Sequence, residues 1–117
     1  MSAETEILAL LRGTPVLAGV AQGFFLNAAD GETPLPYVVI TATHASELLL
    51  SGEIDGESIS FSIACWGVSA SVAESVGDLV QGSLLRSNNY LVSARVGGFD
   101  QQTSCDACVI TAEQWVT

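Results

Sequence analysis

The chain has 117 residues, of which 49% are apolar and 14% are charged, and its formal net charge is −10. The chain has three arginines and no lysine, but 13 acidic residues. This balance excludes a protein that binds DNA tightly, because stable nucleic-acid binding needs Lys and Arg to neutralise several phosphates. Average soluble proteins carry about 25% charged residues. Two explanations compete for this shortfall: uncharged Ser, Thr, Gly, Asn and Gln fill the surface, or part of the apolar surface is buried against partners. The abundance of Ser and Gly supports the first, and the mean hydropathy of +0.45 indicates that the second contributes as well.

Length and hydropathy give two further expectations. A chain of this length is expected to fold as a single domain over residues 1–117. No stretch approaches the ~20 uninterrupted apolar residues that span a bilayer, and the longest candidate, residues 16–26, is interrupted by polar residues and glycines. The first residues are acidic where a secretory signal is basic, so we expect the protein to be made in the cytoplasm and not exported through a membrane.

Two helices are predicted at the N-terminus. Residues 3–12 place three apolar side chains on one face and two acids near the helix start, where the helix dipole favours them. Gly13 ends this helix. Thr14 as N-cap and Pro15 at the first helical position then begin a second, short helix that ends by Gly23.

Strand signals follow on both sides of a proline-containing segment. Residues 24–26 are predicted as a brief strand, and residues 27–33 as a polar turn. Pro34 and Pro36 keep the chain extended and prevent a helix between them. Residues 37–43, rich in β-branched side chains, are predicted as a strand.

Residues 58–66 form the clearest strand of the sequence. Large apolar side chains alternate there with small ones, which indicates a sheet with one core face and one lightly polar face. The small face is nearly flat, so either solvent or another closely packed surface covers it. The large set is Ile59, Phe61, Ile63 and Cys65, and the small set is Ser58, Ser60, Ser62 and Ala64.

A connecting loop is predicted over residues 46–57, and its tip is the candidate contact surface. Three consecutive leucines precede a glycine-rich acidic turn. Because side chains alternate along a strand, one strand face cannot hide all three leucines. Two interpretations stay open: an extension of the strand packed on the core, or a surface made for a partner. The candidate interface residues are Leu48, Leu49, Leu50, Glu53 and Asp55.

The longest helix is predicted from Ser69 or Ser71 to about Leu85, with an apolar stripe at helical spacing. Gly77 and Gly82 either weaken this helix locally or permit close packing on the sheet.

Three segments complete the predicted sheet: residues 90–96, 99–103 and 109–116. Gly97 and Gly98 are expected to loosen or bulge the strand between the first two. The order of elements predicts an α+β fold, an antiparallel or mixed β-sheet with helices packed on one face.

Candidate catalytic and metal-binding residues are few. Cys105 and Cys108 have a C-x-x-C spacing, but a strand follows them, whereas a redox motif of this kind sits at a helix start. Only Cys65 and His44 remain to complete a zinc site. Ordinary half-buried thiols and a structural histidine are therefore the favoured interpretation, with a small Cys/His metal protein as the alternative. No catalytic, cofactor or metal site is predicted.

Short motifs follow one another along nearly the whole chain. They are the helix motif ILALL (7–11), PVLAGV (15–20), the strand entry LPYVV (35–39), the strand FSIACW (61–66) that ends in a tryptophan, and a final strand containing Trp115. In this order and spacing the chain resembles the tail completion, or tail terminator, proteins of long-tailed bacteriophages. Two features depart from the family pattern: FFLN (24–27) replaces its basic and aromatic element, and the C-terminal cysteines are not typical of it.

The resemblance implies a virion structural protein and no enzyme or cofactor. It implies a homo-oligomeric ring, six-fold in this family, at the head–tail junction, where the ring ends polymerisation of the tail tube and meets the head–tail connector protein. DNA would pass through the lumen without specific binding, and acidic walls would not retain it. The alternatives are another head–tail connector or minor tail protein, the metal protein named above, and a homo-oligomeric module that binds a small ligand.

Overall fold

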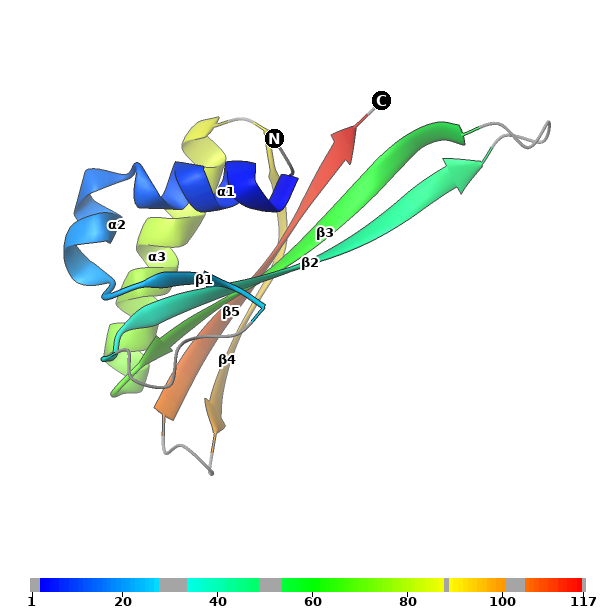
Figure 1. The fold of residues 1–117 in the computed structure, drawn as a ribbon. Helices are drawn as coiled ribbons and strands as arrows, with labels where there is room; N and C mark the ends of the chain where they lie inside the picture. Colours follow the sequence, from blue (N-terminus) through cyan, green and yellow to red (C-terminus); the bar gives the residue numbers. More distant parts are fainter. Residues whose placement is uncertain (1–2, 28–33, 49–53, 88, 101–104, 117) are drawn as a thin grey trace.

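In the computed structural model, which describes residues 3–27, 34–48, 54–87, 89–100 and 105–116, three helices pack on a five-stranded mixed sheet. The strands are β1 (Phe24–Leu26), β2 (Tyr37–Leu48), β3 (Ile54–Gly67), β4 (Leu91–Asp100) and β5 (Cys105–Val116). The helices α1 (Ala3–Arg12), α2 (Pro15–Val20) and α3 (Ala70–Ser87) lie together on one side of the sheet (Figure 1). The predicted α+β class, with helices on one face, is confirmed.

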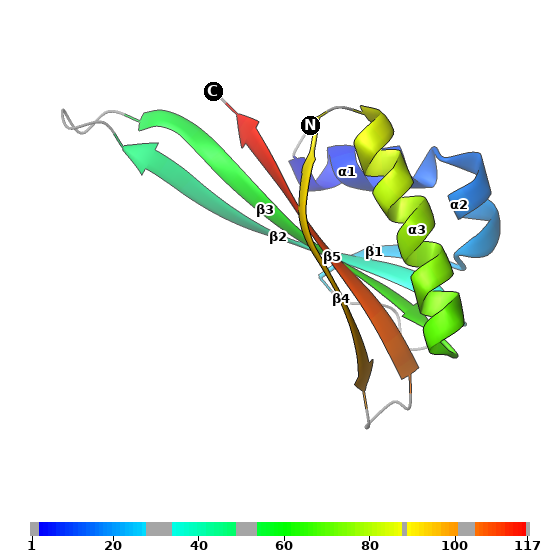
Figure 2. The same ribbon diagram turned by 180° about the vertical axis from the view of Figure 1, so that it is seen from behind.

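The sheet has the strand order β1-β2-β3-β5-β4. The short β1 runs parallel to β2, and the other three pairs, β2–β3, β3–β5 and β4–β5, are antiparallel. The sheet is therefore mixed, with β1 at one edge and β4 at the other. Seen from behind, the helices again cover a single face, and the ends of β2 and β3 project beyond them (Figure 2).

The N-terminal helices begin and end where the sequence predicts. The N–H of Gly13 donates to the Ala9 carbonyl and closes α1. Pro15 then takes the first turn of α2, where its missing N–H costs nothing because that group has no partner within the helix. Arg12 donates from Nη2 to the Phe24 carbonyl over 3.1 Å, so the end of α1 is tied to β1.

Helix α3 starts after Ser69, the first of the two predicted caps. The N–H of Val72 donates to Ser69 Oγ over 3.3 Å, and the N–H of Ala73 donates to the Ser69 carbonyl. The helix continues to Ser87, slightly past the predicted end. Among the described residues no helix is both long and apolar enough to cross a membrane.

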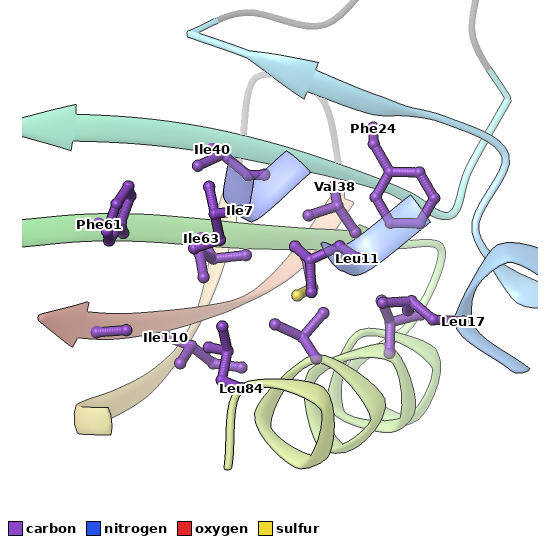
Figure 3. Close-up of a cluster of buried hydrophobic side chains, with 14 of the residues drawn as sticks. Ile7, Leu11, Leu17, Phe24, Val38, Ile40, Phe61, Ile63, Leu84 and Ile110 are labelled. Atoms are coloured by element: carbon purple, nitrogen blue, oxygen red, sulfur yellow. The ribbon is translucent and has the colours of Figure 1, made fainter. Parts of the chain in front are cut away.

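The core lies between the helices and the near face of the sheet (Figure 3). Fully buried side chains come from each layer, and burial of each large one stabilises the fold by roughly 1.5–3 kcal/mol. The predicted alternation of β3 is confirmed, since its four large side chains are at most 3% exposed. Helix and sheet contribute Ile7, Leu11, Leu17, Val76, Val80, Leu84, Val38, Ile40, Phe61, Ile63, Cys65 and Ile110.

The predicted loop over residues 46–57 is wrong, because most of it is strand. Residues 46–48 of β2 pair with residues 54–57 of β3, so only residues 49–53, which lie outside the described residues, separate the two strands. β2 is accordingly five residues longer than predicted. The strand was not predicted because glycine and acidic residues interrupt the apolar alternation in this segment. Backbone pairing between two adjacent antiparallel strands does not need apolar side chains.

The predicted bulge at Gly97 and Gly98 is also wrong. These glycines pair regularly with Cys108 and Ala107, and the register shift lies between Val92 and Ala94. Strict alternation would place residues 92, 94 and 96 on one face. The extra residue at Ser93 resets the alternation, so that Val92 and Arg95 both face the helices. Ser93 Oγ donates to the Thr111 carbonyl at this point.

Candidate assembly surfaces

The central part of the sheet face opposite the helices is almost free of charge. In residues 37–43, 58–66, 91–99 and 107–113 the only charged residues are Arg95, which faces α3, and Glu113. Cross-strand registers join these strands into rows, one of which runs Thr41, Ser62, Thr111 and Ala94. The serine face predicted from β3 alone is therefore one column of a wider neutral surface, which we call the open face.

One end of the open face is apolar and aromatic. The next row joins Val39, Ala64, Val109 and Val96, and Val96 is 63% exposed. Phe25 pairs with Val39 in register, and its ring meets that of Tyr37 edge-on at 6.1 Å between centroids. Tyr37 and Trp66 are directly opposite each other on neighbouring strands. Sequence reasoning on single strands missed this cluster, because only the register brings its members together.

The arms of the β2–β3 hairpin form a second candidate surface. β5 pairs with β3 only from Glu57 onward, so in the described residues Ile54, Asp55 and Gly56 have a neighbouring strand on the β2 side alone. In Figure 1 these arms extend past the helices. A two-stranded ribbon is marginally stable in water by itself, and contact with a partner is one way to stabilise it.

Two of the five predicted contact residues lie in the described arms of this hairpin. Leu48 is the last residue of β2 and pairs with Ile54 at a register irregularity, and Asp55 lies in β3. Leu49, Leu50 and Glu53 lie outside the described residues.

On the helix side, Arg95 anchors β4 to α3. Nη1 donates to Gln81 Oε1 (2.9 Å) and Asp78 Oδ1 (2.8 Å), and Nη2 donates to Glu74 Oε2 (2.7 Å) and the Glu74 carbonyl (3.0 Å). Burial by itself lowers the pKa of Arg95, but the hydrogen bonds to Glu74 and Asp78 outweigh it and raise that pKa. The i, i+4, i+7 spacing of Glu74, Asp78 and Gln81 signals a polar stripe, but the sequence does not identify its partner.

The two cysteines of the C-x-x-C motif do not face each other. Cys105 and Cys108 both lie in β5, where a spacing of three turns them to opposite faces. Cys65 and Cys108 are fully buried and opposite each other in register. Burial raises the pKa of Cys65 to about 12 and also raises the pKa of Cys108, which makes both thiols poor nucleophiles.

His44 lies within β2, and its Nε2 pairs with Glu4 Oε1 of α1. The contact links the first helix to the sheet and gives the histidine a structural role. Within the described ranges, no group of three or more His, Cys, Asp or Glu side chains is placed to hold a metal ion.

A small α+β protein with a neutral sheet face and a projecting hairpin has surfaces of the kind through which structural proteins assemble. Comparison with known families specifies it further: residues 5–106 match the family described as Tail completion protein gp17, so the chain belongs to this family and is a structural protein of the virion tail. The resemblance stated from the sequence motifs is confirmed.

A search of solved structures gives the same fold. A chain from the structure described as "Virion of native gene transfer agent (GTA) particle" superposes with a TM-score of 0.75 and 15% sequence identity, over 94% of this chain and 90% of that one. A search of curated protein sequences found no significant match.

Proposed function

We propose that the chain forms a six-fold ring on the head-proximal end of the tail tube, ends polymerisation of the tube, and presents the surface that the head–tail connector protein joins. The observation that carries this proposal is the match to the tail completion family over residues 5–106. The related fold in a chain of a gene transfer agent virion supports it.

The neutral open face supports self-assembly on physical grounds. Copies of a chain with a net charge of −10 repel one another. That repulsion is weakest where the surfaces that meet carry no charge, and over residues 37–43, 58–66, 91–99 and 107–113 the open face carries Glu113 alone. Its half-buried aromatic end supplies apolar area of the kind that subunit interfaces bury.

We assign the hairpin to the contact with the tube or the connector. Leu48 ends β2 and Asp55 lies in β3, within a ribbon that extends beyond the helices. The candidate residues Leu49, Leu50 and Glu53 lie between these two strands in the sequence. Contact through such an arm needs no rearrangement of the core. Replacing Leu49 and Leu50 by serine is expected to weaken attachment to tube ends, while the free subunit keeps its melting temperature.

The acidic charge suits a conduit for DNA. Two of the three arginines, Arg12 and Arg95, already bond within the chain, and the acids would repel a passing polyanion. Charge reversal of Glu53 and Asp55 to lysine is expected to slow DNA passage and ejection, an effect that high salt reduces. Unchanged ejection in the double variant would remove these two residues from the lumen wall.

Tail length is the direct test of the proposed function. Tails assembled without this chain are expected to vary in length or to exceed the normal length, and the added protein to restore a single length. Light-scattering mass and electron microscopy, with and without tail tubes, report the ring itself. A stable monomer that never decorates a tube end contradicts the proposal. Binding to isolated capsids instead of isolated tubes identifies a connector protein.

A further inference from the structure

β4 is an edge strand with few of the features that normally prevent edge pairing. It is the last strand in the order β1-β2-β3-β5-β4, and within the described part of the chain β5 is its one neighbouring strand. Natural edges are protected by lysine, proline, short length or bulges. β4 has ten residues, contains neither lysine nor proline, and has one register shift, before Ala94.

The side chains of β4 leave its outer edge apolar. Leu91, Val96 and Phe99 are 65%, 63% and 57% exposed. The guanidinium of Arg95, which would otherwise discourage pairing, is directed to Glu74 and Asp78 of α3. An exposed apolar edge of this length is an association site in a soluble protein.

The opposite edge of the sheet has a segment with no neighbouring strand on its outer side among the described residues. β1 covers only Val38, Val39 and Ile40 of β2, and the N–H of Asn27 donates to the Ile40 carbonyl where that cover ends. From residue 41 to residue 48, no strand among the described residues lies on the outer side of β2. The first three residues of this segment, Thr41, Ala42 and Thr43, are uncharged.

Strand direction makes the two edges compatible. Three successive antiparallel pairings separate β2 from β4, so β4 runs opposite to β2. When two copies stand side by side in a ring whose axis is tilted from the strands, as in a barrel, all strands keep their direction relative to the axis, and β4 of one copy meets β2 of the next antiparallel. An interface between two different edges is heterologous, which is the type that closes rings.

We propose that β4 of one copy pairs antiparallel with residues 41–48 of β2 in the next copy, so that the sheets join edge to edge around the ring. The occupant of the β4 edge is a second copy, because both compatible edges belong to this chain. The open-face side chains at the seam, such as Thr43 and Val96, are uncharged. The inference rests on the proposed ring and names its subunit contact. Ala94 is in the same cross-strand row as Thr41, so pairing of Val96 with Thr41 or Thr43 requires a shift along the strands. Strands tilted to the ring axis, as in a closed barrel, supply such a shift.

Cysteine cross-linking tests the seam. Double variants that carry Val96→Cys with either Thr41→Cys or Thr43→Cys are expected, for at least one pair, to give a covalent ladder up to ring size on mild oxidation. Each single variant is expected to remain uncross-linked. The matched control, Val68→Cys with Thr43→Cys, uses an equally exposed position, 66% against 63%. All variants also carry Cys105→Ser, because the native Cys105 is only part-buried, whereas Cys65 and Cys108 are buried and do not compete.

Four outcomes separate this inference from the proposed function. A ladder in a 96/41 or 96/43 pair, absent from the control, supports the seam. Cross-linked dimers of Val96→Cys alone indicate β4–β4 pairing and overturn it. Rings that form on tube ends without any ladder overturn the seam and leave the proposed function standing, whereas no ring with or without tubes contradicts both.

Val96→Lys is expected to lower the ring fraction at least tenfold with an unchanged monomer melting temperature, and Val68→Lys to leave the ring fraction unchanged.

Discussion

Gly77 of α3 lies directly against Cys108 of β5, so that a Cβ atom at position 77 would stand 2.6 Å from the Cys108 Sγ and 3.2 Å from Arg95 Nη2. Helix and sheet approach this closely because position 77 has no side chain. Of the two interpretations that the sequence gives for Gly77, local weakening of the helix or close packing on the sheet, the close packing is confirmed.

Gly77→Ala is expected to destabilise the protein although alanine favours helix. Overpacking costs about 1–3 kcal/mol, which exceeds the gain in helix propensity of up to about 1 kcal/mol. Gly82→Ala on the same helix is the matched control, because its Cβ would meet only the Arg86 side chain, at 3.5 Å. The control is expected to gain stability in urea unfolding. Equal stability of the two variants would contradict the close contact.

Arg95 is expected to stabilise the protein more through its hydrogen bonds than through its charge. Its side chain is 24% exposed, but Glu74 and Asp78 are 50% and 72% exposed, so water screens both ion pairs. Arg95→Met should therefore lower the free energy of unfolding by about 1–2 kcal/mol, mainly through the lost bonds to Gln81 and the Glu74 carbonyl. Addition of 1 M NaCl to the wild type should have a much smaller effect, which would not be so if charge dominated.

Stability is expected to fall in alkali because two thiols are buried. The pKa of Cys65 rises from 9.0 to about 12 on folding. Between pH 9 and pH 12 the thiol therefore ionises in the unfolded chain but stays neutral in the folded one, so the free energy of unfolding falls over this range, whereas below pH 9 it does not depend on this group. The loss amounts to about 4 kcal/mol for a shift of this size. Burial raises the pKa of Cys108 and of Tyr90 in the same direction. Cys65→Ala should flatten the fall in unfolding free energy above pH 9, and an unchanged slope would assign the effect to other groups.

The sequence predicts the elements whose side chains alternate or repeat over a core, as Ile59, Phe61 and Ile63 do. It fails where backbone pairing continues without a core, as in the hairpin arms, and where one residue shifts the register, as at Ser93. The candidate surface was predictable in part: the serine face follows from β3 alone. The aromatic end follows only from the register that puts Trp66 opposite Tyr37.

Two phenylalanines on opposite faces of the sheet should separate folding from assembly. Phe61 is fully buried, and its ring meets that of Tyr90 edge-on at 5.7 Å; Phe61→Ala should cost about 3–5 kcal/mol of stability. Phe25 is half-buried on the open face beside Tyr37, so Phe25→Ala should cost less than half as much. We expect Phe25→Ala to reduce ring formation, measured by light scattering at a temperature where circular dichroism shows it folded. A fully assembling Phe25→Ala variant would exclude the aromatic end of the open face from the subunit contact.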